Sequence, residues 1–587
     1  MTHNSSPQIT VLDAGGQYCH LIARKIRDLG VYADVCPSDT PASELRGRKG
    51  LIISGGPDSV YESDSSRIDP AILSQGGAVL GICYGQQLMA HELGGRVRKG
   101  TKGEYGLAVL EKTRPHALFA DLNGGSQVWM NHRDQVETVP EGFEVLAKTN
   151  TCSVAAMAHR DRPLMAVQFH PEVVHTPQGH KILSNFVFGV CHCTPDWDPK
   201  DRIRPLEAEI RSVAGDRSVF FFVSGGVDST VAYTLCLRAL GADRVYGIYV
   251  DTGLMRDGET EYVRRLFAQL GATAFHIEAA EAEFLGALAG VCDPEQKRHI
   301  IGEQFVAVQE RVLSTGQFLD GRWILGQGTI YPDTIESGGS ARADVIKTHH
   351  NRVAGIQKLI DAGRIIEPLA SFYKDEVREI GAELGIPGEF LHRHPFPGPG
   401  LAIRCLCSET VAHVTRRDPG WLLPIRSVGV KGDSRSYQSV LALDNVPDED
   451  VATDLVNSMP DINRVVGRVL SEETDIPEMR SSRGTLTPER LNRLRRADAI
   501  VRRLSEEWGF DRHVWQFPVV LIPLGDGRDP DSIVLRPIHS VDGMTAQVVR
   551  MPNMLMWSIA GELSQIDGIC AVFYDLTHKP PGTIEWE

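Results

Sequence analysis

Residues 220–235 have the sequence FFFVSGGVDSTVAYTL, in which a short apolar run meets a glycine-serine turn and then a longer run of helical character. This order is typical of a strand, a loop and a crossover helix in a parallel sheet. The amides and hydroxyls of such a turn, with the N-terminus of the next helix, bind anionic oxygens. The stretch therefore predicts an α/β domain with a phosphate-binding loop, although a glycine-serine turn without a ligand is a common alternative.

The loop has no lysine, unlike the GxxxxGK[ST] loop, whose lysine contacts the β- and γ-phosphates during transfer of the terminal phosphoryl group. A shorter loop without lysine suits a grip on pyrophosphate as the leaving group, so that a nucleophile attacks the α-phosphorus and AMP is transferred. Asp228 is placed to hold Mg²⁺ on the pyrophosphate oxygens. We expect ATP to be bound by Ser224, Gly225, Gly226, Val227, Asp228, Ser229 and Thr230.

Residues further along the chain extend the predicted ATP site. Val250 ends a second apolar strand, where an adenine ring can lie beside backbone groups. Lys347 and Lys374 are available to neutralise phosphate charge, and a solvated surface position is the alternative for each lysine. We include Val250 and Lys374 in the expected ATP site.

The whole chain has the composition of a soluble protein with several domains. It contains 587 residues, of which 42% are hydrophobic and 23% are charged, and its formal net charge is −15. The acidic charge argues against a broad nucleic-acid surface, because a phosphate backbone requires a cationic partner. No stretch approaches the roughly 18 apolar residues of a membrane span, and the first ten residues lack a signal-peptide pattern. We therefore expect a cytoplasmic protein with no nucleic-acid or membrane partner.

Eleven cysteines occur without a CxxC pair, which favours reduced thiols over disulfides. Two close pairs, Cys191 with Cys193 and Cys405 with Cys407, raise the alternative of a metal site. Neither pair has the two-to-four-residue gap of common zinc ligands, so thiols are the preferred interpretation.

The periodicity of apolar residues predicts three domains. From residue 8 to residue 193, apolar runs that end in glycine alternate with helical patterns, which predicts a doubly wound, mostly parallel sheet. Residues 194–201 are polar, contain two prolines and are expected to form a linker. Residues 202–394 predict a second doubly wound α/β domain. Residues 395–587 begin with PFPGPGLAIR, which fits neither a helix nor a sheet interior, and continue in an α+β layout.

One cysteine occupies a sharp turn in the first predicted domain. In AVLGICYGQQL, Cys83 lies between Gly81 and Gly85, where an apolar strand turns into a helix. This is the arrangement of a nucleophile elbow, and the helix N-terminus favours the thiolate. From this segment alone, a buried cysteine at a strand end is an equal alternative.

Two other segments of that domain favour catalysis. In MAVQFHPEVVHT, His170 closes an apolar run two residues before Glu172, so a base and its orienting carboxylate can both lie at a strand end. The segment LIISGGP supplies Gly55 and Gly56, whose amides can pair with that of Tyr84 to form an oxyanion hole, and we select Gly56. We therefore expect Cys83, His170 and Glu172 to form a catalytic triad.

The motifs GGP, GICYGQQ and QFHPE, in this order, resemble a class I glutamine amidotransferase. That resemblance implies that the triad makes and breaks a γ-glutamyl thioester and releases ammonia from glutamine. SGGVDS after an apolar strand resembles the ATP pyrophosphatase family, whose members adenylate a carbonyl oxygen for attack by a nitrogen or sulfur nucleophile. Together they imply an ATP-dependent amidation or amination that needs Mg²⁺ and no organic cofactor.

Motifs along the whole chain resemble the glutamine-hydrolysing GMP synthetase family, among them GTIYPDTIES, KTHHN, SVGVKGDSRSY, SVDGMT and KPPGTIEWE. The resemblance implies that XMP is adenylated on its C2 oxygen and then attacked by ammonia, which gives GMP, AMP and pyrophosphate. It implies a backbone-rich cradle at PGPGL. It also implies XMP contacts from Arg464, Gln516, Lys579 and Glu585. For each of these residues taken alone, a surface salt bridge or a satisfied buried polar group is the alternative.

The region after Arg404 is longer than in the compact bacterial form, and it resembles an extended, eukaryotic-like version with two related subdomains in one chain. An added subdomain can occupy the surface that a second chain would cover, so a monomer and a homodimer both remain open.

Two other functions are alternatives. One is another glutamine-dependent ATP pyrophosphatase, such as an NAD synthetase. The other is a non-catalytic nucleotide sensor, against which the intact Cys83, His170, Asp228 and Ser229 argue.

Overall fold

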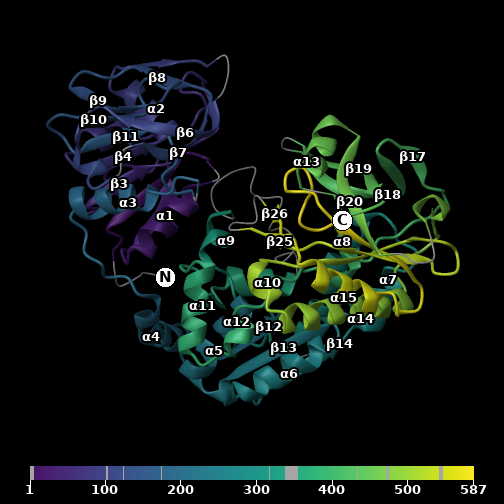
Figure 1. The fold of residues 1–587 in the computed structure, drawn as a ribbon. Coiled ribbons are helices and arrows are strands. Elements are labelled where there is room, and N and C mark those ends of the chain that lie inside the picture. Colours follow the sequence, from purple (N-terminus) through teal and green to yellow (C-terminus); the bar gives the residue numbers. More distant parts are fainter. Residues whose placement is uncertain are drawn as a thin grey trace. The chain divides into compact units, whose positions relative to one another are not determined.

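The computed structural model describes residues 6–16, 18–100, 104–122, 125–173, 175–315, 318–336, 354–431, 434–447, 449–459, 461–470, 475–540 and 546–587. The chain divides into two compact units, Met1–Arg202 and Ile203–Glu587. This division falls beside the expected linker at 194–201, and the expected boundary at 394/395 stays a prediction. Figure 1 draws the first unit in purple and blue and the second in teal to yellow.

A nine-stranded sheet forms the centre of the first unit, in the order β2-β1-β3-β4-β11-β10-β9-β6-β7. Its strands are β1 (Ile9–Asp13), β2 (Ala33–Pro37), β3 (Gly50–Ile53), β4 (Ala78–Ile82), β6 (Glu104–Lys112), β7 (Ser126–His132), β9 (Phe143–Lys148), β10 (Ala156–His159) and β11 (Leu164–Val167). The five strands from β2 to β11 are parallel, as the alternating pattern predicts. The other four are antiparallel, because links as short as 160–163 cannot make the crossover that a parallel pair requires.

Helices and a small ribbon complete the first unit. The helices are α1 (Cys19–Asp28), α2 (Tyr84–Glu92) and α3 (Gly179–Ser184), and the ribbon pairs β5 (Arg96–Arg98) with β8 (Gln135–Thr138). Leu88 of α2 is fully buried and shares one apolar cluster with Leu12, Ile53 and Val79 of the parallel strands. The helix therefore begins against the carboxyl ends of these strands, where Cys83 precedes it.

The second unit contains a five-stranded parallel sheet in the order β14-β13-β12-β15-β16. The strands are β12 (Ser218–Val223), β13 (Val245–Asp251), β14 (Phe275–Ala279), β15 (Trp323–Gly326) and β16 (Ile365–Ile366). The chain moves outward in one direction from β12 to β14 and in the other direction through β15 and β16. The point between β12 and β15 is thus a topological switch point, and ligands of such sheets bind at the strands' carboxyl ends there.

Several helices accompany this sheet, and Figure 1 shows α5 and α6 beside its strands. They are α4 (Ile203–Ala214), α5 (Val227–Leu240), α6 (Glu259–Gln269), α7 (Glu281–Ala287), α8 (Pro294–Thr315), α9 (Tyr331–Glu336), α10 (Ala354–Asp361), α11 (Lys374–Glu383) and α12 (Gly388–Leu391). Helix α5 directly follows the glycine-serine loop, which places the helix N-terminus at the switch point. The second doubly wound α/β sheet expected from the sequence is thus confirmed.

A seven-stranded mixed sheet follows, in the order β17-β18-β19-β20-β27-β24-β22. The strands are β17 (Thr415–Arg417), β18 (Gly420–Lys431), β19 (Ser434–Leu443), β20 (Ile462–Leu470), β22 (Val519–Ile522), β24 (Asp531–Leu535) and β27 (Ile569–Asp575), and the helices are α13 (Glu449–Ser458), α14 (Pro488–Glu507) and α15 (Asn553–Leu563). Figure 1 shows α14 and α15 side by side.

This sheet repeats one topology twice. Strands β18 and β19 are antiparallel, and β19 then pairs in parallel with β20 after α13. Strands β22 and β24 are likewise antiparallel, and β24 pairs in parallel with β27 after α15. The two halves meet where β20 pairs with β27 in the antiparallel sense. The α+β region thus consists of two topologically related halves, as the expected pair of subdomains requires.

One apolar core runs through both sheets of the second unit. It contains Phe220 and Ile248 of the parallel sheet together with Leu401, Leu491 and Ile533 of the α+β region. This shared core explains why residues 203–587 form one compact unit. In the part of the chain that the structure describes, no helix is both long and apolar enough to span a bilayer.

Candidate active sites

Cys83 lies between β4 and α2 with a backbone φ of 52°. Such a left-handed conformation is uncommon for a residue with a side chain, and it is the strained turn that exposes a nucleophile above a sheet. Both flanking positions must be glycine, because other backbone segments pass too close to them for a side chain to fit. A Cβ on Gly81 would collide with the carbonyl oxygen of Gly85, and a Cβ on Gly85 would collide with that of Ile53. The structure therefore has the expected elbow.

His170 and Glu172 follow β11, the strand beside β4. The distance from His170 Nδ1 to Glu172 Oε1 is 2.6 Å, and both side chains are buried. The backbone amide of His170 donates to the Trp129 carbonyl at 3.0 Å, and Thr176 Oγ1 donates to the His170 carbonyl at 2.7 Å. These contacts fix the imidazole with Nε2 available for another partner.

Cys83 lies beside this imidazole. His170 Nε2 is buried without a hydrogen-bond partner, and a Cβ on Gly55 would lie 3.5 Å from Cys83 Cβ and 3.1 Å from His170 Cε1, so the two side chains meet beside Gly55. Burial disfavours a charged imidazole, but Glu172 and Cys83 outweigh it and raise the pKa of His170 to about 10. A protonated imidazole at neutral pH stabilises a neighbouring thiolate, which is the reactive form of cysteine.

The two expected oxyanion-hole residues lie next to each other. Tyr84 is the first residue of α2, so its amide is one of the helix N–H groups without an intrahelical partner. Gly56 follows β3, and a Cβ on it would lie 3.3 Å from Tyr84 Cδ1 and would collide with the carbonyl of Ala14. The structure thus brings both residues to the elbow.

Two polar residues near the elbow were not expected from the sequence. Cys83 Sγ donates to the carbonyl of Asn131, 3.5 Å away. The next residue, His132, lies with Nε2 3.1 Å from Glu104 Oε2, and burial lowers the pKa of His132 against the opposing effect of Glu104. Both residues end β7, whose approach to the elbow depends on antiparallel pairing that the sequence pattern does not reveal.

The expected ATP loop connects β12 to α5 at the carboxyl edge of the parallel sheet. Ser224 Oγ lies 3.1 Å from Ser229 Oγ and accepts from the Gly226 amide at 3.2 Å. Thr230 Oγ1 donates to the Gly226 carbonyl at 2.9 Å. Gly226 is the N-cap of α5 and directly precedes its first helical residue, Val227. The loop thus presents hydroxyls and amides at a helix N-terminus.

An ion pair joins this loop to a distant helix. Lys374, the first residue of α11, has its Nζ 2.5 Å from Asp228 Oδ2. The other oxygen, Asp228 Oδ1, is buried without a hydrogen-bond partner. A bare carboxylate oxygen suits a hard cation such as Mg²⁺. Within the described ranges, no cluster of three or more His, Cys, Asp or Glu side chains is arranged to hold a metal ion.

Of the two other residues considered for the ATP site, the structure describes Val250 but not Lys347. Val250 is buried in β13, one residue before that strand's carboxyl end, next to β12. Lys347 lies outside the described residues, as do the motif KTHHN and residues 541–545 of SVDGMT. The eleven cysteines are all free, as expected.

The cradle PGPGL contacts the same edge of the parallel sheet. The amide of Leu401 donates to the carbonyl of Leu254, which follows β13, at 2.7 Å. Gly400 has φ of 65°, and a Cβ there would collide with that carbonyl. The cradle is thus held directly at the carboxyl end of the strand beside the ATP loop.

Two expected XMP residues, Gln516 and Glu585, lie together beside the cradle. Gln516 Nε2 donates to the Pro395 carbonyl at 2.9 Å and to Glu585 Oε1 at 3.3 Å. Arg404, which follows the cradle, donates from Nε to Glu585 Oε2 at 2.9 Å and from Nη2 to Glu585 Oε1 at 2.7 Å. The sequence did not indicate Arg404, because its partner lies 181 positions away.

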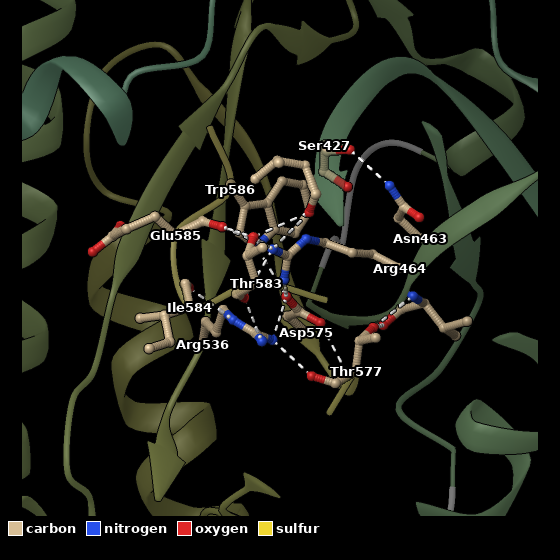
Figure 2. Close-up of polar contacts among 12 residues, drawn as sticks. Ser427, Asn463, Arg464, Arg536, Asp575, Thr577, Thr583, Ile584, Glu585 and Trp586 are labelled. Carbon is tan, nitrogen blue, oxygen red and sulfur yellow. Dashed lines mark hydrogen bonds and ion pairs between the residues drawn. The ribbon is translucent and has the colours of Figure 1, made fainter. Parts of the chain in front are cut away.

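Arg464 is fully buried in β20, and Figure 2 shows its guanidinium among protein groups. Nη1 donates to Asp575 Oδ2 at 2.8 Å, and Nη2 donates to the Thr583 carbonyl at 2.9 Å and the Glu585 carbonyl at 2.8 Å. Arg536 Nη1 donates to the same Asp575 oxygen at 2.7 Å. Arg464 thus contacts the backbone of the segment that carries Glu585.

The expected XMP residue Lys579 is half-buried. Its amide donates to the Ala546 carbonyl at 2.8 Å, and the Ala546 amide donates back to the Lys579 carbonyl at 3.1 Å. Lys579 also makes a further interaction within the protein.

Known families match three parts of the chain. Residues 10–190 match "Glutamine amidotransferase class-I", residues 202–300 match "NAD synthase", and residues 504–586 match "GMP synthase C terminal domain".

Curated relatives match nearly the whole chain. A probable glutamine-hydrolysing GMP synthase of Leptospira interrogans is 41% identical over 604 residues, which cover 99% of this chain and 99% of the relative. The glutamine-hydrolysing GMP synthase of Thermomicrobium roseum is 40% identical and covers 100% of this chain and 98% of its own length. That of Caldicellulosiruptor saccharolyticus is 39% identical, with 99% coverage of both chains.

Proposed function

The chain belongs to the family of glutamine-hydrolysing GMP synthases, and on that premise we propose how its residues divide the reaction. The protein is a ligase that makes GMP with glutamine as the amide donor. The observation that carries this assignment is identity of about 40% over the full length of curated GMP synthases. In the proposed reaction XMP, ATP, glutamine and water give GMP, AMP, pyrophosphate and glutamate.

The glutaminase half is proposed to act through Cys83. Its thiolate attacks the γ-carbonyl carbon of glutamine, and the tetrahedral oxyanion accepts hydrogen bonds from the amides of Gly56 and Tyr84. His170 gives its proton to the departing ammonia and then takes one from the water that hydrolyses the thioester. The 2.6 Å contact with Glu172 keeps the imidazole oriented through both steps. Glutamate is the other product.

The adenylating half is proposed to hold ATP in the 224–230 loop. The loop amides, hydroxyls and helix N-terminus bind the β- and γ-phosphates. Lys374 adds a positive charge beside the loop, 2.5 Å from Asp228. Asp228 would hold Mg²⁺, which would neutralise charge on the leaving pyrophosphate. The C2 oxygen of XMP attacks the α-phosphorus, pyrophosphate leaves, and ammonia then displaces AMP from C2.

XMP is proposed to lie on the PGPGL cradle. Gln516 and Glu585 are proposed to contact the nucleotide there, and Lys579 is proposed to supply a cation for its phosphate. Arg464 supports this site through its hydrogen bond to the Glu585 carbonyl, and a direct contact between Arg464 and XMP stays a prediction. Because the cradle is bonded to the loop after β13, the purine oxygen and the α-phosphorus are expected to meet at one sheet edge.

We propose that the enzyme works in the cytoplasm and needs no organic cofactor. A monomer and a homodimer are both consistent with the reaction. The repeated halves of the α+β sheet support the monomer, because β20 and β27 already pair with each other inside one chain.

One assay with two substrates tests this function. The purified enzyme is given Mg·ATP, glutamine and either XMP or deamido-NAD, and the nucleotide products are separated. We expect AMP and GMP with XMP and no ATP cleavage with deamido-NAD. AMP formation with deamido-NAD instead would favour the NAD synthetase alternative, to which the match at residues 202–300 points. No nucleotide product with either substrate would favour the sensor alternative.

A further inference from the structure

Arg404 has donor groups that no protein atom uses, and it lies beside the proposed XMP residues. We propose that Arg404 determines nucleotide specificity by holding the Glu585 carboxylate and donating from Nη1 to the C2 oxygen of XMP. This inference rests on the proposed reaction and adds the residue that distinguishes XMP from purine nucleotides without that oxygen.

The geometry around Arg404 leaves one face of its guanidinium unsatisfied. The residue is 0% exposed, and Nε and Nη2 both donate to Glu585 at 2.9 and 2.7 Å. Nη1 is buried and has no hydrogen-bond partner. Burial disfavours the charge, but Glu585 outweighs it and raises the pKa of Arg404, so the guanidinium stays protonated. Buried donors without a partner are unfavourable, and a ligand acceptor that pairs with them gains accordingly.

Two other buried arginines in the same unit use all three guanidinium nitrogens in hydrogen bonds to the protein. Arg536 is also 0% exposed, and its Nε, Nη1 and Nη2 all donate to protein oxygens. Arg490 is 7% exposed and likewise uses all three nitrogens. Burial therefore does not by itself leave a guanidinium nitrogen unpaired, although Nε of the fully buried Arg464 also lacks a partner.

The surroundings of Arg404 suit a planar base. The ring of Phe396, which directly precedes the cradle, lies with its centroid 5.3 Å from Arg404 Cζ and 4.6 Å from Arg256 Cζ. Arg256 lies 3.3 Å from Asp498, while Glu585 balances Arg404. Asp498 also pairs with Arg502 at 2.9 Å, whereas Glu585 is the one carboxylate that pairs with Arg404. Nη1 of Arg404 still has no hydrogen-bond partner in the protein.

The position of Arg404 also fits the chemistry of C2. The cradle that precedes Arg404 is bonded to Leu254 beyond β13, next to the strand that carries the ATP loop. Glu585 offers carboxylate acceptors to ring N–H groups, and Nη1 beside it offers donors to a carbonyl oxygen. A xanthine base presents that combination, a C2 carbonyl flanked by N–H groups. Hypoxanthine has C–H at C2 and N3 without hydrogen, so IMP leaves Nη1 unpaired.

Variants at Arg404 test this assignment in the full-length enzyme. Arg404→Lys and Arg404→Met are assayed for AMP formation from XMP and Mg·ATP with ammonium as the nitrogen source, and IMP is titrated as a competitive inhibitor. We expect the KM for XMP to rise about a hundredfold while the inhibition constant of IMP changes less than about threefold, because only XMP has the oxygen that Arg404 contacts. The methionine variant should show the larger loss of discrimination.

The matched control is Arg490→Lys, a buried arginine of the same unit with every nitrogen in use. This variant should change the urea midpoint of unfolding without changing the KM for XMP or the inhibition constant of IMP. If the Arg404 variants weaken binding of XMP and of IMP by the same factor, the residue only supports the fold. If neither the KM for XMP nor the inhibition constant of IMP changes, Arg404 does not contact the base. Either result overturns the proposal.

A second measurement needs no variant. The 2-thio analogue of XMP carries sulfur, a weaker acceptor, at C2, and the wild-type enzyme should bind it about tenfold more weakly than XMP. Equal affinity for the two would contradict the proposed contact. A wild-type enzyme that forms no AMP from XMP would instead refute the proposed reaction, so the two failures are distinct.

Discussion

Lys374 Nζ and Asp228 Oδ2 lie 2.5 Å apart, although 146 positions separate the two residues in the chain. The pair joins the N-terminus of α11 to the first turn of α5, directly at the lysine-free loop. A lysine-containing phosphate loop supplies its cation from within its own sequence. Here the fold supplies the cation from another helix, at a point next to the expected leaving pyrophosphate.

Replacing Lys374 with methionine is expected to slow XMP-dependent AMP formation by on the order of a hundredfold, because a preorganised cation beside the leaving group is lost. Glutamine hydrolysis should keep its basal rate. Lys358→Met is the control, since Lys358 is exposed on α10. Equal rates for the two variants would show that the Lys374 charge does not serve the adenylation.

Replacing Cys83 with alanine is expected to lower GMP formation from glutamine by at least about a thousandfold, because the nucleophile is removed. GMP formation from added ammonium should be retained, since the adenylating site is untouched. The partly exposed Cys36 on β2 gives the control variant, Cys36→Ala. If Cys83→Ala makes GMP from glutamine as fast as Cys36→Ala does, the thioester route is wrong.

The stability of the first unit should depend on pH through His170. Its pKa is raised from 6.5 to about 10 in the folded protein. A raised pKa stabilises the fold fully below the unfolded value near 6.5, and this contribution is lost as pH rises through about 10. We expect the urea midpoint of the wild-type protein to fall over that window.

Glu172→Gln should make this pH dependence smaller, because the carboxylate is the main group that raises the pKa of His170. Comparing the two proteins at each pH cancels the contribution of other titrating groups. Identical slopes in wild type and variant between pH 6.5 and 10 would exclude Glu172 as the partner of a charged His170.

Asp575→Asn is expected to destabilise the second unit by about 3–5 kcal/mol, because it leaves two buried guanidiniums without their shared carboxylate. Asp575 Oδ2 accepts from Arg464, Arg536 and Trp586 (Figure 2). Urea unfolding measures the change. The exposed ion pair of Asp418 with Arg416 offers a control, and Asp418→Asn should change stability by less than about 0.5 kcal/mol. A similar midpoint for both variants would contradict the shared-carboxylate account.

Local patterns in the sequence predicted much of the fold and of the catalytic groups. Apolar runs that end in glycine and continue into helical patterns predicted both parallel sheets. Gly81 and Gly85 predicted the elbow at Cys83, because only glycine leaves room for the close backbone contacts there. Gln516 and Glu585, for which the resemblance implied XMP contacts, are hydrogen-bonded to each other, and the XMP contacts stay a prediction.

Contacts between distant segments were beyond such patterns. The guanidinium of Arg464 binds Asp575, 111 positions away, and faces the backbone of the segment that carries Glu585. The sequence did not point to Arg404, because its contacts depend on Glu585, 181 positions away. The antiparallel half of the first sheet arises from links that are too short for crossovers. The shared apolar core of residues 203–587 likewise exists only in the folded chain.

The central claim is that the oxygen at C2 of XMP attacks the α-phosphorus of ATP. The most direct measurement uses XMP labelled with ¹⁸O at C2, together with Mg·ATP and glutamine, and analyses the phosphate-containing products by mass spectrometry. The account predicts that the label appears in AMP and that unlabelled pyrophosphate is released. Label in orthophosphate with ADP as the nucleotide product would contradict it.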